Sequence, residues 1–115
     1  MITTKPEGEI IMNKNKIFAP YHPGELLRET LEELGVSQYR FAKITGISPA
    51  VLCGICKGKR SVSADSAIRI ARALGTDAQS WLNMQAFYDL EVAEAEKHET
   101  FDKIAVIPQA AALAV

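Results

Sequence analysis

Residues 37–60 read SQYRFAKITGISPAVLCGICKGKR, the pattern of two short helices joined by a tight turn. Ser37 is a good N-cap for the first helix, which Gly46 ends after about two turns. Ser48 caps the second helix, and Gly58 ends it. A connection of about three residues therefore joins the two helices.

The apolar residues of this pair are spaced so that each helix has one inner face. The expected inward-facing side chains are Phe41, Ala42 and Thr45 in the first helix and Val51, Leu52 and Ile55 in the second. Gly46 can adopt the left-handed backbone conformation that the turn demands, and the small Ala42 lets the helices approach closely. The spacing predicts a helix-turn-helix with a fixed angle between its helices.

One amphipathic helix is expected before this pair. It begins at His22 and Pro23, because proline suits a first helical turn, and it ends at Gly35. Its apolar stripe would consist of Leu27, Leu31 and Leu34.

Two more helices are expected after the pair, which makes the predicted fold all-α with five helices. Ser63 caps the fourth helix and Gly75 closes it, while Asp77 caps a fifth helix that runs to about Lys97. The expected inner residues are Ala67, Ile70, Ala71 and Leu74 in the fourth helix and Trp81, Leu82, Met84 and Phe87 in the fifth, the latter set in the core or at an interface.

The two ends of the chain lack this periodicity. Residues 1–20 mix charged residues with proline and glycine and predict a flexible N-terminal arm. Residues 98–115 predict a C-terminal tail, with a possible short strand at residues 104–108. Residues 21–97 are therefore expected to form one domain, which contains the helix-turn-helix.

Composition agrees with a single globular domain. The chain has 115 residues, of which 48% are hydrophobic and 23% are charged. No run approaches the roughly 18 apolar residues that a membrane span requires, and the N-terminus lacks the pattern of a secretory signal. No membrane association is expected, and the cytoplasm is the expected compartment.

The net charge of −1 conceals a cationic centre. Residues 37–60 contain five Lys or Arg and no acidic residue, whereas both flanks are acidic overall. In a helix-turn-helix the second helix enters the major groove of DNA, so this block predicts phosphate contacts. The candidate DNA-binding residues are Gln38, Ser48, Pro49, Ala50, Cys53, Gly54, Lys57, Lys59 and Arg60.

These candidates have different expected roles. The hydroxyl of Ser48, the free amides of that helix turn and the side chain of Gln38 would meet phosphates, and Lys57, Lys59 and Arg60 would neutralise the backbone without reading sequence. The reading helix is poor in hydrogen-bond donors, so thymine methyl contacts by Ala50 or Val51, together with DNA shape, would have to supply specificity.

Gly54 is unusual because it stands in the middle of the reading helix. Glycine costs about 1 kcal/mol there relative to alanine. Two interpretations are open: a close approach of another group to the helix backbone, or a weakened helix.

An enzyme is not expected. Cys53 and Cys56 have the spacing of a redox motif, but the strand and the alternating α/β context of that motif are missing. Only His22 and His98 could complete a metal site, whereas a structural zinc ion normally takes four well-spaced ligands. No catalytic residue, metal or cofactor is therefore predicted.

Longer motifs around the helix pair resemble the HigA-type antitoxins, also called VapI-like, of the lambda-repressor-like (XRE) helix-turn-helix superfamily. The motifs are His22-Pro23-Gly24-Glu25, Gly46-Ile47-Ser48, Gly58-Lys59-Arg60, AIRIARALGT at residues 67–76, Trp81-Leu82-Asn83-Met84-Gln85 and Tyr88-Asp89-Leu90. The first motif and the Trp-Leu-Asn-x-Gln segment are more specific to the family than the helix-turn-helix alone.

The resemblance implies a homodimer that binds double-stranded operator DNA over its own promoter. It also implies a protein partner, a HigB (RelE-like) toxin that cuts messenger RNA on the ribosome. The alternative is a stand-alone XRE-type transcriptional regulator without a toxin. The acidic residues of the first helix and of residues 89–103 are then either solvated faces or a surface that mimics nucleic acid toward a basic toxin.

Overall fold

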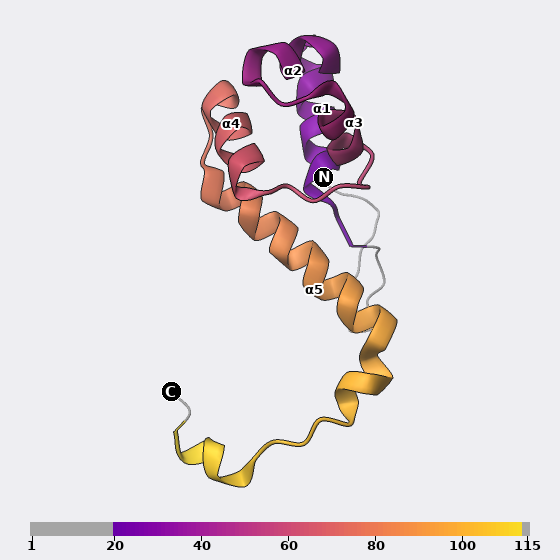
Figure 1. The fold of residues 1–115 in the computed structure, drawn as a ribbon, viewed down its shortest axis with the longest axis vertical. Helices are drawn as coiled ribbons and strands as arrows, with labels where there is room; N and C mark the ends of the chain where they lie inside the picture. The colour runs from indigo at the N-terminus through magenta and orange to yellow at the C-terminus, as the bar shows by residue number, and fades with distance from the viewer. Residues whose placement is uncertain (1–19, 114–115) are drawn as a thin grey trace.

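A computed structural model of the chain describes residues 20–113 (Figure 1). This part contains five α-helices, a final 3-10 turn and no strand. The elements are α1 (Pro23–Leu34), α2 (Gln38–Thr45), α3 (Pro49–Cys56), α4 (Ala64–Leu74), α5 (Ala78–Asp102) and η1 (Pro108–Ala112). The predicted all-α class and the five helices are confirmed, whereas the predicted arm falls almost entirely outside the described residues.

Every α-helix begins at a side chain that caps it. Ser37, Ser48, Ser63 and Asp77 each accept a hydrogen bond from a backbone N–H of the first turn, as the sequence predicts. In α1 the cap is His22, whose Nδ1 accepts from the Gly24 amide at 2.9 Å. These local interactions fix where each helix starts.

The core lies where α1, α2, α3, α4 and the first turns of α5 meet. Leu27, Leu52, Ile55, Ala67 and Ile70 are completely buried there. All three inward residues predicted for α2 are buried, as are Leu52 and Ile55 of α3, while Val51 is half-buried. The apolar periodicity therefore located most of the core.

The prediction that Leu34 belongs to the inner stripe of α1 is wrong, because its side chain is 59% exposed. The helix ends there, and Gly35 takes a left-handed conformation with φ 70°. The Val36 amide then donates to the Leu31 carbonyl at 3.0 Å, which is the hydrogen bond of a Schellman motif. That turn packs Val36 against the core and leaves Leu34 in solvent.

The later part of α5 also departs from expectation. The helix continues to Asp102, although its backbone is non-helical at Lys97, near where the periodicity fades. Beyond Gln85 no residue of α5 is buried, and Phe87 is 66% exposed and hence outside the core. Figure 1 shows the second half of α5 extending away from the other helices.

The possible strand at residues 104–108 is not present. Residues 104–107 are irregular and exposed, and η1 follows them. A strand needs a partner for its backbone hydrogen bonds, and the described chain offers none beside this segment.

The crossing of α1 and α3 depends on Gly24. A Cβ atom at Gly24 would lie 1.7 Å from the carbonyl oxygen of Ile55, so only glycine fits. Arg28, one turn later, donates from Nη1 to the Cys56 carbonyl at 3.2 Å and so caps the end of α3. His22 is buried and packs edge-on against Tyr88 of α5, with ring centroids 4.8 Å apart.

Two polar side chains on one face of α5 attach that helix to the bundle. Gln85 is buried, accepts from the Val62 amide at 2.8 Å and donates to Asp89 at 2.9 Å. Trp81, four residues earlier, is also buried, and its indole N–H donates to Thr76 Oγ1 at 2.9 Å. Packing is therefore the role of Trp81, and Gln85 satisfies a buried amide of the loop between α3 and α4.

We predict that Gly24→Ala destabilises the protein by about 3 kcal/mol, because α1 must move away from a backbone carbonyl of α3. Urea unfolding at fixed protein concentration measures the change. Gly35→Ala is the control: it has no atom within 4 Å of the added Cβ and costs only the strain of its positive φ, about 1 kcal/mol. Equal losses in the two variants would contradict the close-approach role of Gly24.

We also predict that Gln85→Met lowers the free energy of unfolding by about 2 kcal/mol, because the buried Val62 amide loses its acceptor. Gln79→Met is the matched control, since Gln79 is exposed and its amide bonds to Asn83 on the same helix. The control is expected to change stability by less than about 0.5 kcal/mol. A loss no larger in Gln85→Met than in the control would refute the role of Gln85.

Candidate nucleic-acid interface

The turn between α2 and α3 is held at both of its sides. Gly46 has φ 80°, and Thr45 Oγ1 donates to the Phe41 carbonyl at 2.8 Å and accepts from the Ile47 amide at 3.2 Å. Arg69 of α4 donates from Nη1 to the Thr45 carbonyl at 2.8 Å. These bonds satisfy the end of α2 and fix its orientation relative to α3 and α4.

One side of α3 is in the core and the other faces solvent. Leu52, Ile55 and Cys56 are buried. Ser48, Pro49, Ala50 and Lys57 are exposed, and Cys53 is half-buried. Because Ala50, Cys53 and Lys57 are three and four residues apart, they share one helix face. The structure thus brings five of the predicted contact residues together on the solvent side of α3.

The first turn of α3 has the chemistry of an anion site. Ser48 Oγ accepts from the Val51 amide at 3.2 Å, which leaves its O–H group able to donate outward. Proline at the first position has no N–H, so the Ala50 amide and the positive end of the helix dipole are what this turn adds in the same direction. Gln38 is half-buried at the first position of α2, so it too stands at the positive end of a helix.

Lys57, Lys59 and Arg60 follow directly at the end of α3. All three are exposed, and none of them forms a salt bridge within residues 20–113. Arg40 and Lys43 of α2 are exposed as well, and the ammonium group of Lys43 lies 5.2 Å from the centre of the Tyr39 ring. With no carboxylate in residues 37–60, these side chains make the α2–α3 side of the molecule electropositive.

Gly54 is covered by a side chain of its own chain. The amides of Lys59 and Arg60 donate to the Gly54 carbonyl at 2.8 and 3.1 Å. A Cβ atom at Gly54 would lie 2.9 Å from Cγ and 3.1 Å from Cδ of Arg60. Of the two interpretations of this glycine, the structure therefore shows a close approach, made by the aliphatic part of Arg60.

Cys56 does not have the environment of a reactive cysteine. Cys56 is 1% exposed, and its burial raises the pKa of the thiol; Cys53 adds to the increase, whereas Arg28 opposes it. Reactive cysteines need a lowered pKa, because the thiolate is the nucleophile. Cys56 was not among the predicted inward residues, and it belongs to the core.

Metal ligands do not gather in the described part of the chain, where no three His, Cys, Asp or Glu side chains come together. No helix in residues 20–113 is long and apolar enough to cross a membrane.

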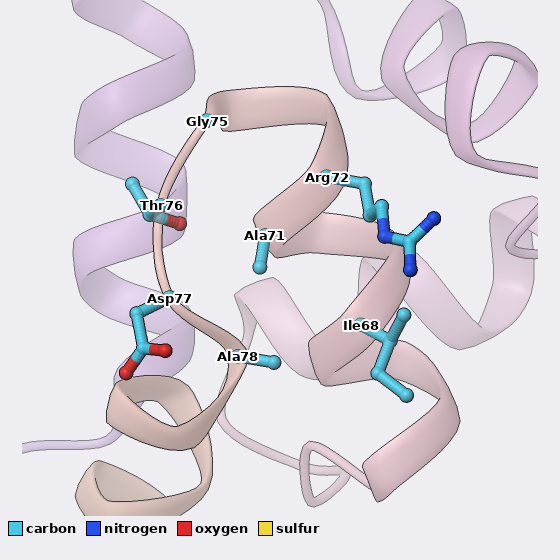
Figure 2. A pocket seen from close by; sticks show the side chains of 7 residues that line it. All are labelled: Ile68, Ala71, Arg72, Gly75, Thr76, Asp77 and Ala78. Atoms are coloured by element: carbon cyan, nitrogen blue, oxygen red, sulfur yellow. The ribbon is translucent and has the colours of Figure 1, made fainter.

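Open hollows lie on the side of α4 and were not predicted. One, of about 340 Å³, is at the corner between α4 and α5 (Figure 2). A second, of about 390 Å³, lies between α2 and α4 and shares Ile68 and Arg72 with the first. The spacing of Ile68 and Arg72, four residues apart and opposite the buried stripe, is the signal that could have indicated this face.

Sequence reasoning also missed the residues that hold α3 in place. Gly24, Arg28 and Gln85 contact α3 or the loop after it, and none of them was a predicted site residue. Gly24 belongs to the His-Pro-Gly-Glu motif and Gln85 to the Trp-Leu-Asn-x-Gln motif. The sequence motifs therefore marked both residues, but not the contacts that explain them.

Comparison with known proteins gives consistent matches. A family model described as helix-turn-helix matches residues 27–81. The chain is 48% identical over 77 residues to virulence-associated protein I of Dichelobacter nodosus. The aligned residues cover 66% of this chain and 71% of the relative.

Solved structures give matches of the same kind. An addiction module antidote protein of the HigA family from Coxiella burnetii has a TM-score of 0.74 at 35% identity, over 78% of this chain and 99% of that protein. Antitoxin HigA of Pseudomonas aeruginosa, solved with the higBA promoter, has a TM-score of 0.73 at 37% identity, over 76% of this chain and 98% of that protein. The chain therefore belongs to the HigA-type (VapI-like) antitoxin family of XRE-type helix-turn-helix proteins.

Proposed function

We propose that this protein is an antitoxin that represses its own operon by binding operator DNA and neutralises a HigB (RelE-like) messenger-RNA-cutting toxin. One observation carries the DNA-binding part: the exposed face of α3 is bordered by three cations that have no ion-pair partner in residues 20–113. The Pseudomonas relative, which was solved with promoter DNA, supports the same assignment.

DNA binding would follow from the geometry of α3. The helix enters the major groove with its first turn toward the base edges, so that Pro49, Ala50 and Cys53 face the bases. Ser48 and Gln38 donate to phosphates on either side of the groove. Lys57, Lys59 and Arg60 contact the backbone where the chain leaves the groove, and they provide affinity rather than specificity.

A homodimer would present two copies of α3 to one operator. We assign both DNA binding and dimerisation to residues 21–97. The exposed apolar side chains of α5, Phe87 at 66% and Leu90 at 62%, supply a surface for the second copy. Two half-sites would then be about 34–36 Å apart along the DNA, one helical turn.

Toxin binding would use the acidic surfaces. Glu29, Glu32 and Glu33 are exposed on α1, and further carboxylates line the second half of α5. A toxin that cuts RNA must itself attract phosphates, so a surface rich in carboxylates suits it. The HigA-family antidote of Coxiella burnetii supports this role by homology.

We expect Lys59→Ala with Arg60→Ala to weaken binding to operator and to unrelated duplex alike, because both side chains would contact phosphates. The slope of log K against log salt should fall by about 2, close to one unit for each lost contact. Fluorescence anisotropy over a salt titration measures both quantities. Lys97→Ala with Lys103→Ala removes the same charge from the far end of α5 and is the control; an unchanged slope in the Lys59/Arg60 variant would reject the phosphate contacts.

We further expect the protein to co-purify with a RelE-like protein encoded beside it and to relieve the growth arrest that this toxin causes. Glu32→Lys with Glu33→Lys should weaken toxin binding about tenfold while operator affinity stays unchanged, since α1 lies outside the DNA face. Glu32→Gln with Glu33→Gln tests whether loss of charge is sufficient. A protein that binds its operator but no such toxin would be a stand-alone regulator instead.

A further inference from the structure

Gly54 has no conformational reason to be glycine. It lies inside α3 and is absent from the glycines with positive φ, so its backbone is ordinary helix that other residues adopt readily. Alanine is the better helix former at such a position. A different constraint must therefore act on Gly54.

That constraint is the side chain of Arg60. Gly58, with φ 75°, reverses the chain after α3, and the amides of Lys59 and Arg60 bond to the Gly54 carbonyl. The backbone of Arg60 is thereby tied to α3. Its Cβ, Cγ and Cδ atoms lie 3.4, 2.9 and 3.1 Å from where a Cβ of residue 54 would stand. The middle of the Arg60 stem, not its mobile end, thus occupies the space of the missing side chain.

The contact restrains a cation at the border of the reading face. Arg60 remains exposed and makes no salt bridge within the described chain, so its guanidinium is available to a phosphate. An arginine that must be ordered on binding loses rotamer entropy, whereas one whose stem is already held loses less. The contact between the Arg60 stem and Gly54 therefore favours DNA binding, although Gly54 itself does not touch DNA.

We propose that Gly54 is a positioning residue, whose missing side chain seats the stem of Arg60 against α3 and aims the guanidinium at the DNA backbone beside the groove. This inference rests on the DNA binding proposed above. It assigns Gly54 an indirect role, through Arg60, in place of a direct contact with the bases.

A double-mutant cycle tests it on the full chain with a promoter duplex and an unrelated duplex. Gly54→Ala is expected to weaken binding to both duplexes about fivefold when Arg60 is present, and to have no further effect in the Arg60→Ala background. In that background Gly54→Ala should also raise the melting temperature, because the clash is gone and alanine favours the helix. The Lys59→Ala background is the control, in which the fivefold loss should persist.

The outcomes separate clearly. Equal losses of affinity with and without Arg60 would mean that DNA itself approaches Gly54. An unchanged affinity of the Gly54→Ala single variant would mean that the contact with Arg60 has no effect on binding. Either result overturns this inference but leaves the proposed function intact. A wild-type chain that binds neither duplex would overturn the proposed function and this inference together. A fall in melting temperature in the Arg60→Ala background would show that another group needs the space, which also overturns the inference.

Discussion

The contact between two backbones at Gly24 determines where α3 lies. Residue 24 touches the Ile55 carbonyl so closely that no side chain fits between them. An isolated helix of eight residues is not stable in water, so α3 owes both its existence and its orientation to its neighbours. Arg28 caps its last carbonyl from α1, and Gln85 holds the loop that follows it. The frame around α3 is thus built mainly from α1 and α2, and α5 secures the loop that follows α3.

This frame explains how a short helix can present a functional surface. All of the supporting contacts are on the inner side of α3 and at its ends, so the side that carries Ala50 and Lys57 is left to solvent. The chain reverses at Gly58 and returns along α3 as far as Gly54, which brings Arg60 beside the same face. Two glycines therefore have different roles in this region: Gly24 allows α1 to pack closely on α3, and Gly58 reverses the chain so that Arg60 lies beside α3.

Local signals account for what the sequence predicted well. Ser37, Ser48 and Gly46 act within one helix turn of their positions, and the apolar periodicity located most of the core. The misses depend on partners that are distant or on geometry beyond the helix. Leu34 is exposed and Val36 packs on the core because the chain turns after Gly35. The role of Gly24 depends on a carbonyl 31 residues further along the chain. The hollow at Ile68 forms only where α5 packs against α4. The exposed face of α3 was predictable, but the seat of Arg60 was not.

We expect the α2–α3 side, and no other side, to bind DNA. Amide chemical shifts of the nitrogen-15-labelled protein, recorded as promoter duplex is added, test it residue by residue. The largest changes are expected at residues 38, 48 and 50–60, with residues 68–78 around the α4 hollow unaffected. Changes centred on that hollow, with α3 unperturbed at saturating DNA, would contradict it.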